Sequence, residues 1–162
     1  MIISRVHTRA EVSVRPAVAA DARRITEVIL AVGWSRDGEA DPPESRWREV
    51  LADDAWWVGV AVDAGQPVGV ATVKPADDMP GTGHITYLAV APEFADRGIG
   101  GALVVAAVEE MRRRGYDRGR LRVAVTNGNA RGFYEHMGWR DTRERMFHEE
   151  LGLDLAEYEV EL

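Results

Sequence analysis

The sequence predicts an α/β domain in which helices flank a central sheet, and three patterns carry this prediction. Apolar residues recur at helical spacing over residues 21–32, and two apolar runs within residues 57–73 are joined by turn residues. At residues 84–114 an apolar run of β type ends in a glycine-rich turn that opens a long helix. With 162 residues, 46% of them hydrophobic, the chain is long enough for a core of its own, so we expect a single domain over residues 1–162.

The first half of the chain is expected to form three strands and two helices. In order, these are a strand at Val12–Arg15, helices at Asp21–Val32 and Pro42–Leu51, and strands at Trp57–Val62 and Val68–Val73. Gly33 is placed to end the first helix, and the two prolines at the start of the second suit a first helical turn. Residues 63–67, which contain Gly65 and Pro67, indicate the turn of a β-hairpin.

The second half is expected to add four strands and two helices. In order, these are a strand at His84–Val90, a helix at Gly98–Arg114, a strand at Arg120–Val125, a helix from Asn127 or Asn129 to Met137, and strands at Trp139–Phe147 and Glu157–Leu162. Arginines at 112–114 suit the negative end of a helix, and Gly115 follows them. The final two strands are expected to be joined across Gly152–Asp154.

The turn at residues 95–101 has the composition of an anion site. Gly98 and Gly100 lack Cβ atoms, so their backbone N–H groups can approach a ligand, and the positive end of the following helix favours a phosphate. Arg97 can add a bidentate contact. A nucleoside triphosphate loop would need a lysine beside the turn, but the only lysine is Lys74, and the third glycine of a dinucleotide motif is missing. The turn therefore indicates another phosphate-bearing cofactor.

A second motif follows one helix and one strand later. Asn127 can cap a helix that contains Ala130 and Tyr134, and Gly138 can end it. With both segments in this order, the chain resembles the GNAT superfamily of acyl-CoA-dependent N-acetyltransferases, in which an RxxGxG/A turn precedes an NxxAxxxYxxxGF helix. The resemblance covers about residues 12–162. It implies a mixed, mostly antiparallel sheet of about six or seven strands with about four flanking helices.

The resemblance also implies acetyl-CoA as cosubstrate, without a metal. The residues that it assigns to the cofactor are Leu88, Ala89, Val90, Arg97, Gly98, Ile99, Gly100, Gly101, Ala102 and Asn127. In the family a β-bulge at the position of residues 88–90 frees backbone N–H groups for the acetyl carbonyl and the pantetheine arm. The family usually has Gln or Arg three residues before the first glycine, whereas this chain has Ala95, followed by Asp96. This departure concerns the affinity for the cofactor.

Transfer of an acetyl group from a thioester to an amine requires a neutral amine, a polarised carbonyl and a proton for the departing thiolate. Tyr134 occupies the position of the tyrosine that the family uses to protonate the thiolate, and a phenol is protonated at neutral pH. The alternative is that Tyr134 is a core residue on the buried face of its helix. Both catalytic and structural roles stay open from the sequence.

The base that takes the proton of the amine is expected on the strand at residues 84–90. His84 can accept a proton directly or through water, or it can be a strand histidine whose partner is a neighbour. Tyr87 lies three residues further along and would point to the opposite face unless a bulge intervenes. Only one of the two could then face the substrate.

The acceptor amine is expected, from the resemblance, between the first two helices and the last pair of strands. The candidate contact residues there are Trp34, Asp37, Glu39 and Tyr87, together with residues 145–158. Acidic residues in the loop at 34–41 would favour a small cationic amine. The alternative is that this loop is only solvated.

Composition restricts the other classes. A net charge of −7 argues against a nucleic-acid binder, and the absence of cysteine excludes disulfides and thiolate nucleophiles. None of the four histidines has metal-site spacing, and no apolar run is long enough for a membrane span. Residues 1–10 lack a signal-peptide core, so we expect a cytoplasmic protein. A homodimer, a non-catalytic acyl-CoA-binding module and a transferase of longer acyl groups are alternatives that the sequence leaves open.

Overall fold

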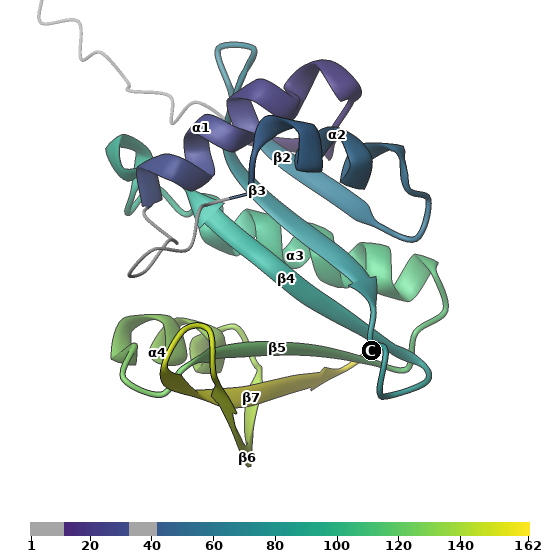
Figure 1. The fold of residues 1–162 in the computed structure, drawn as a ribbon, viewed down its shortest axis with the longest axis vertical. Coiled ribbons are helices and arrows are strands. Elements are labelled where there is room, and N and C mark those ends of the chain that lie inside the picture. Colours follow the sequence, from purple (N-terminus) through teal and green to yellow (C-terminus); the bar gives the residue numbers. More distant parts are fainter. Residues whose placement is uncertain (1–11, 33–41) are drawn as a thin grey trace, which may run out of the picture.

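The computed structural model describes residues 12–32 and 42–162, which form one seven-stranded sheet with helices on both faces (Figure 1). The strand order is β1-β2-β3-β4-β5-β7-β6, and only β4 and β5 are parallel neighbours. The predicted fold class, mixed and mostly antiparallel, is confirmed. The helices are α1 (Ala22–Val32), α2 (Glu44–Ala52), α3 (Ile99–Arg113) and α4 (Gly128–His136), and the strands are β1 (Ser13–Pro16), β2 (Trp57–Asp63), β3 (Gln66–Pro75), β4 (Thr82–Val90), β5 (Arg118–Ala124), β6 (Arg140–His148) and β7 (Leu153–Glu161).

Helices α1 and α2 cover one face of the sheet. Ile25 and Ile29 from α1 and Trp47 from α2 are fully buried against Val60 and Val70 of β2 and β3. The burial follows from the helical spacing of the apolar residues in α1, which places them on one side of the helix. This layer holds the N-terminal half of the sheet in place.

Helices α3 and α4 cover the opposite face. Leu103 and Met111 of α3 are buried on the sheet, and Tyr134 of α4 joins the same apolar cluster as Met111, with Leu121 of β5 and Tyr158 of β7. Apolar residues at alternate positions of β5 point into this layer, because side chains alternate across a strand. The two helices that carry the predicted motifs therefore lie on the same side of the sheet.

The hairpin between β2 and β3 has a tighter turn than predicted. Asp63 pairs with Gln66, so the loop is only Ala64 and Gly65, both with positive φ (46° and 79°). Two positive φ values in a two-residue loop match the right-handed twist of the strands. The prediction of a five-residue turn at 63–67 was wrong, because glycine and proline there belong to the turn and to the start of β3 rather than to a longer loop.

The last hairpin also differs from the prediction. β7 begins at Leu153, inside the segment expected to be the loop, and β6 ends at His148. Asp154 is exposed within the strand, although it lies on the same face as the buried Ala156 and Tyr158, because side chains alternate along a strand. An exposed polar residue near the end of a strand resembles a loop residue in a sequence. No helix in residues 12–32 or 42–162 is both long enough and apolar enough to span a membrane.

Candidate active site

Strands β4 and β5 pair over only four residues each and then diverge (Figure 1). Thr82–Ile85 pairs with Arg118–Leu121, and the C-terminal half of β4 has no β5 partner. Ala91 N–H donates to Val68 O, so alternation along an antiparallel pair directs the N–H groups of Val90 and Leu88 away from β3. Two predicted cofactor residues thus offer backbone donors at this open edge, whereas Ala89 faces β3.

A bulge in β4 lies two residues earlier than the resemblance implied. Ala71 pairs with Leu88 and Val73 with Ile85, so Thr86 and Tyr87 together face Thr72. The Tyr87 N–H donates to the Thr72 hydroxyl at 3.0 Å instead of to a strand carbonyl. The bulge was expected at 88–90. It instead precedes those residues, which keep a regular register with β3.

The turn before α3 presents unpaired backbone donors. Gly98 has φ 78° and precedes the first helical residue, Ile99. The first hydrogen bond of the helix runs from Ala102 N–H to Gly98 O at 3.1 Å. The preceding N–H groups, up to Gly101, therefore have no helical acceptor. Ala102 was predicted to contact the cofactor as well, but its N–H is already used.

The two glycines of the turn play different roles. Gly98 has a left-handed conformation, and a Cβ there would meet open space, so backbone strain rather than crowding favours glycine. A Cβ on Gly100 would lie 3.6 Å from the ring of Phe133, an ordinary contact. The expectation that a side chain at Gly100 would fill the path to the backbone donors is not supported, because that Cβ points toward α4.

Arg97 is exposed and lies over the ring of Phe94, 4.9 Å from the ring centroid. This cation–π contact holds the guanidinium beside the turn. Ala95, where the family usually has a polar side chain, is exposed, and Asp96 has a positive φ of 61°. Because neither Ala95 nor Asp96 carries a positive charge, Arg97 is the one cationic side chain within residues 92–101.

Tyr134 lies at the centre of an aromatic cluster in α4. Its ring contacts Phe133, Trp139 and Tyr158 at tilted or edge-to-face angles, and the residue is 8% exposed. Burial raises the pKa of Tyr134 to about 12. Within the described part of the chain its hydroxyl makes no hydrogen bond. The result is a phenol that stays protonated and keeps its donor for a ligand.

Tyr158 of β7 differs from Tyr134 in its hydrogen bonds, and the sequence analysis did not single it out for a role. Its hydroxyl donates to Glu135 at 2.9 Å and accepts from Arg131 Nε at 3.1 Å. Arg131 also bonds the carboxylate of Asp141 at 3.2 Å. The hydrogen bonds of Tyr158 are therefore used within the fold. Asn127 has a similar structural role, since its side-chain oxygen caps α4 through the N–H of Ala130 at 3.1 Å.

His84 and Tyr87 share the α1–α2 face of the sheet. Ile85 and Leu88 pack on the α3 side, and Tyr87 packs edge-to-face on Trp47 of α2, with ring centroids 5.2 Å apart. The bulge at Thr86 and Tyr87 interrupts the alternation of faces along β4. Tyr87 therefore shares a face with His84, which the sequence allowed only if a bulge lay between them. Tyr87 lines a hollow with Trp47, Val50, Trp56, Lys74 and Thr86.

The imidazole of His84 is bonded within the protein. Arg120 Nε donates to His84 Nδ1 at 3.2 Å. Burial, with the nearby charges of Arg120, Arg122 and Lys74, lowers the pKa of His84 to about 4. This geometry favours the alternative of a strand histidine with a neighbouring partner, because a group with so low a pKa accepts a proton poorly near pH 7.

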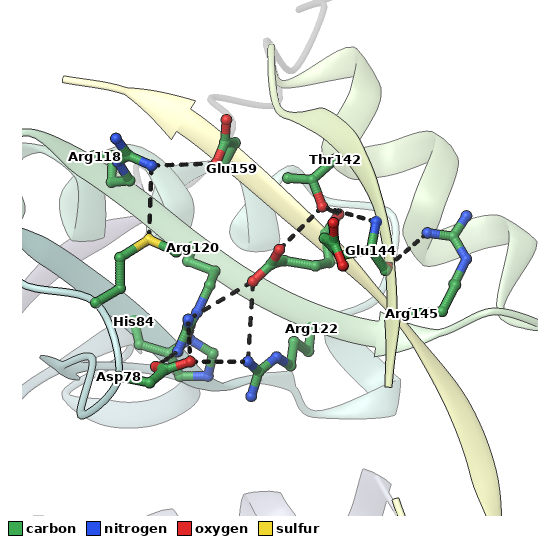
Figure 2. A network of polar contacts seen from close by, with 11 residues as sticks. Asp78, His84, Arg118, Arg120, Arg122, Thr142, Glu144, Arg145 and Glu159 are labelled. Carbon is green, nitrogen blue, oxygen red and sulfur yellow. Dashed lines mark hydrogen bonds and ion pairs between the residues drawn. The ribbon is translucent and has the colours of Figure 1, made fainter. Parts of the chain in front are cut away.

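A cluster of charged residues surrounds His84 and was missed by the sequence analysis (Figure 2). Arg120 is buried and forms a bidentate pair with Asp78 at 2.8 and 3.1 Å. Arg122 lies two residues further along β5, with Asp78 at 3.7 Å and Glu157 at 4.0 Å. The alternation of arginine with apolar residues in β5 was the available signal, because it places the arginines on one face.

Three predicted acceptor contacts, Trp34, Asp37 and Glu39, lie outside the described residues. On the α1–α2 face the structure does describe Tyr87, the hollow beside it and the charged cluster around His84. Within residues 12–32 and 42–162 no group of three His, Asp or Glu side chains is arranged to hold a metal ion.

The comparison with known families decides the classification. The model of the Acetyltransferase (GNAT) family matches residues 20–139, most of the chain. The chain belongs to the GNAT family of acetyltransferases. The resemblance inferred from the two motifs is thereby confirmed, and the GNAT match spans the open edge of β4, the turn before α3 and Tyr134.

Individual relatives match this GNAT chain either over a short segment or at low sequence identity. A mycothiol acetyltransferase of Beutenbergia cavernae is 45% identical over 58 residues, which is 36% of this chain and only 20% of that protein. A GNAT-family acetyltransferase structure from Desulfovibrio desulfuricans has a TM-score of 0.80 at 24% identity, covering 93% of this chain and 99% of the other. PaiA N-acetyltransferase of Thermoplasma acidophilum, solved with coenzyme A, has a TM-score of 0.75 at 17% identity, covering 94% and 99%. These structures share the fold.

Proposed function

We propose that the protein is an N-acetyltransferase that transfers an acetyl group from acetyl-CoA to a primary amine by direct attack. The observation that carries the proposal is the combination of an open edge on β4, four N–H groups at the start of α3 and the hydroxyl of Tyr134, none of which has a hydrogen-bond partner among the described residues. Membership of the GNAT family supports it. A location in the cytoplasm stays a prediction.

The residues present fit a diphosphate-bearing thioester. The N–H groups of residues 98–101 and the positive end of α3 suit the diphosphate, with Arg97 beside them. The N–H groups of Leu88 and Val90 suit the acyl carbonyl and the amide groups of the pantetheine arm. Asn127 would contribute through its amide group, since its oxygen caps α4. Acetyl-CoA, when bound, supplies an acetyl group activated as a thioester.

Tyr134 is proposed as the general acid. The nitrogen of the acceptor attacks the carbonyl carbon, the carbon–sulfur bond breaks, and Tyr134 donates its phenolic proton to the departing sulfur. A pKa raised to about 12 by burial keeps this proton in place throughout the neutral range. Tyr134 regains a proton from water after the product leaves. No covalent bond to the protein is required.

The proton of the acceptor is proposed to leave through water or before binding. His84 has a pKa of about 4, so it contributes little driving force as a base near pH 7. Tyr87 lies on the same face, within the bulge, and its hydroxyl is proposed as the other group that could relay a proton to water. An acceptor that is already neutral would need neither group.

A thiol-release assay tests the proposal. The protein is mixed with acetyl-CoA and each member of a panel of primary amines, and free coenzyme A is measured. Amine-dependent release that disappears in Tyr134→Phe is expected. Binding of acetyl-CoA without release with any amine would instead identify a binding module, and release only with longer acyl-CoA donors would identify a different acyl group. The absence of binding would refute the cofactor assignment itself.

A further inference from the structure

Three cationic or imidazole side chains stand in a row across the α1–α2 face. Lys74 of β3 is in register with His84 of β4, and His84 with Arg120 of β5. Adjacent strands are about 4.8 Å apart, so these side chains are near neighbours. Arg122 lies on the same face of β5, just beyond the last residue that pairs with β4. The four side chains line one hollow with Asp77 and Asp78.

The acidic residues of this cluster pair closely with Arg120 and only at longer distances with Arg122 (Figure 2). Both oxygens of Asp78 bond Arg120, which also has Glu157 at 3.7 Å. Arg122 has only the long contacts to Asp78 and Glu157, 3.7 and 4.0 Å, and makes no hydrogen bond to any described residue. Its side chain is 27% exposed. Arg122 therefore keeps a set of N–H donors that the described fold does not use.

Lys74 is also weakly paired. Its one ion pair within residues 12–32 and 42–162 is with Asp77 at 3.7 Å, and the Asp77 side chain is 90% exposed. An exposed pair of this kind contributes little. The ammonium group lies 5.5 Å from the ring centroid of Trp56. Lys74 lines both this hollow and the aromatic hollow beside Tyr87, so it stands at the boundary between them.

The charges around His84 also indicate a site for an anion. The pKa of His84 falls to about 4, first through burial and then through Arg120, Arg122 and Lys74, while Asp78 opposes the shift only weakly. A neutral His84 cannot compensate for an added positive charge. The three cationic side chains that line the hollow also outnumber its two acidic ones, so the lining suits an anion better than a further cation. This differs from the cationic acceptor expected from the acidic loop at 34–41, which lies outside the described residues.

We infer that the acceptor is an amine that also carries an anionic group, a carboxylate or a phosphate, which binds Arg122 and Lys74 in the hollow beside His84. The inference rests on the proposed function, because it names the substrate class of that site. His84 pairs with Lys74 and Leu88 with Ala71, three residues along β3 or about 10 Å, so the amine and the anion lie well apart in the acceptor. An arginine fork and an ammonium group both suit such an anion.

Pairs of acceptors that differ only in the anion test the inference. The thiol-release assay compares a series of ω-amino acids of increasing length and short peptides with their C-terminal amides, and aminoalkyl phosphates with the corresponding amino alcohols. We expect kcat/KM to be about 10- to 100-fold higher for the anionic member of the best pair, the range of one or two charge-assisted hydrogen bonds. The arm with the larger ratio identifies the anion as carboxylate or phosphate.

Substitutions locate the effect. In Arg122→Gln the ratio should fall to within about threefold of one, while kcat/KM for the neutral member changes by less than about threefold. Arg118→Gln is the matched control, since Arg118 is on the same strand but lies outside the hollow, where it contacts Met79 Sδ at 3.6 Å and Glu159 at 3.9 Å. Lys74→Gln gives an independent variant if Arg122→Gln is unfolded. Thermal unfolding of each variant checks the fold.

The outcomes separate this inference from the proposed function. Release with neutral amines and no preference for the anionic member in any pair would overturn the inference and leave the acetyltransferase function standing. A preference that survives in both Arg122→Gln and Lys74→Gln would also overturn it, because the anion would then bind elsewhere. No release with any amine would refute the proposed function, and the inference would fall with it.

Discussion

Replacing Tyr134 by phenylalanine should separate catalysis from folding. The substitution removes one oxygen, and in the structure this oxygen has no hydrogen bond within the described residues. The three ring contacts with Phe133, Trp139 and Tyr158 are kept. We therefore expect the free energy of unfolding to change by less than about 0.5 kcal/mol. Turnover should fall by about 10² to 10⁴, the usual loss for a general acid, with little change in the affinity for acetyl-CoA.

Tyr158→Phe is the matched control, because the same atom is removed from the same cluster. The Tyr158 hydroxyl bonds both Arg131 and Glu135, and its loss removes one hydrogen bond from each of these charged groups, although Arg131 keeps its bonds to Val125 O and Asp141. This variant should lose about 1–3 kcal/mol of stability, and its turnover should stay within about tenfold of the wild type. Urea denaturation gives the stabilities, and the thiol-release assay gives the rates.

The pH dependence completes the test of Tyr134. Because burial raises its pKa to about 12, its proton is retained at alkaline pH, and Tyr134 should cause no fall in turnover between pH 7 and 10. A descending limb in this range that vanishes in Tyr134→Phe would contradict the burial that the structure shows. Turnover of Tyr134→Phe within twofold of wild type would make Tyr134 a core residue and refute its role as the acid.

Three further predictions concern the turn and His84. Gly98→Ala should weaken acetyl-CoA binding and cost about 1 kcal/mol of stability, since an L residue is strained at φ 78°; Gly100→Ala, whose Cβ would meet the Phe133 ring at 3.6 Å, should change affinity only a few-fold by calorimetry. Ala95→Arg should tighten coenzyme A binding by about 0.5–1.5 kcal/mol, the range of one exposed charged contact, and weaker binding would show that the side chain points away from the diphosphate. His84 has a folded pKa of about 4, below its ordinary value of 6.5, so stability should be full above about pH 6.5 and should fall by up to about 3 kcal/mol as the pH drops toward 4. His84→Gln should remove that pH dependence, and its rate profile between pH 6 and 8 should match that of the wild type; a lost acid limb there would restore His84 as the base.

Local signals were sufficient for most of the elements. Helical spacing of Ile25 and Ile29 gave α1, and Asn127 and Gly138 marked the ends of α4, because caps and periodicity depend on neighbours in the chain. The two hairpin loops were misplaced by a few residues, because Pro67 belongs to the start of β3 and the exposed Asp154 near the start of β7 resembles a loop residue. The helix and strand order that identifies the family was therefore readable without the structure.

The sequence predicted the candidate site only where the site consists of backbone groups at the start of a helix. Gly98 and the start of α3 were predicted because a strand, a glycine turn and a helix are consecutive in the sequence. The side to which a Cβ on Gly100 would point depends on how α3 packs against α4. Such packing joins residues about 30 positions apart and has no local signal.

The sequence by itself determined that the chain belongs to the GNAT family and that Tyr134 lies in the second helix after the glycine turn, because these motifs are local patterns of residue type and spacing. Tertiary structure decided what surrounds them. The bulge at Thr86 and Tyr87 arises from pairing with β3, and it brings Tyr87 to the same face as His84. The low pKa of His84 comes from Lys74 and the β5 arginines, which lie on neighbouring strands. Charge and burial at a site depend on distances through space, and only the pairing of the strands sets those distances.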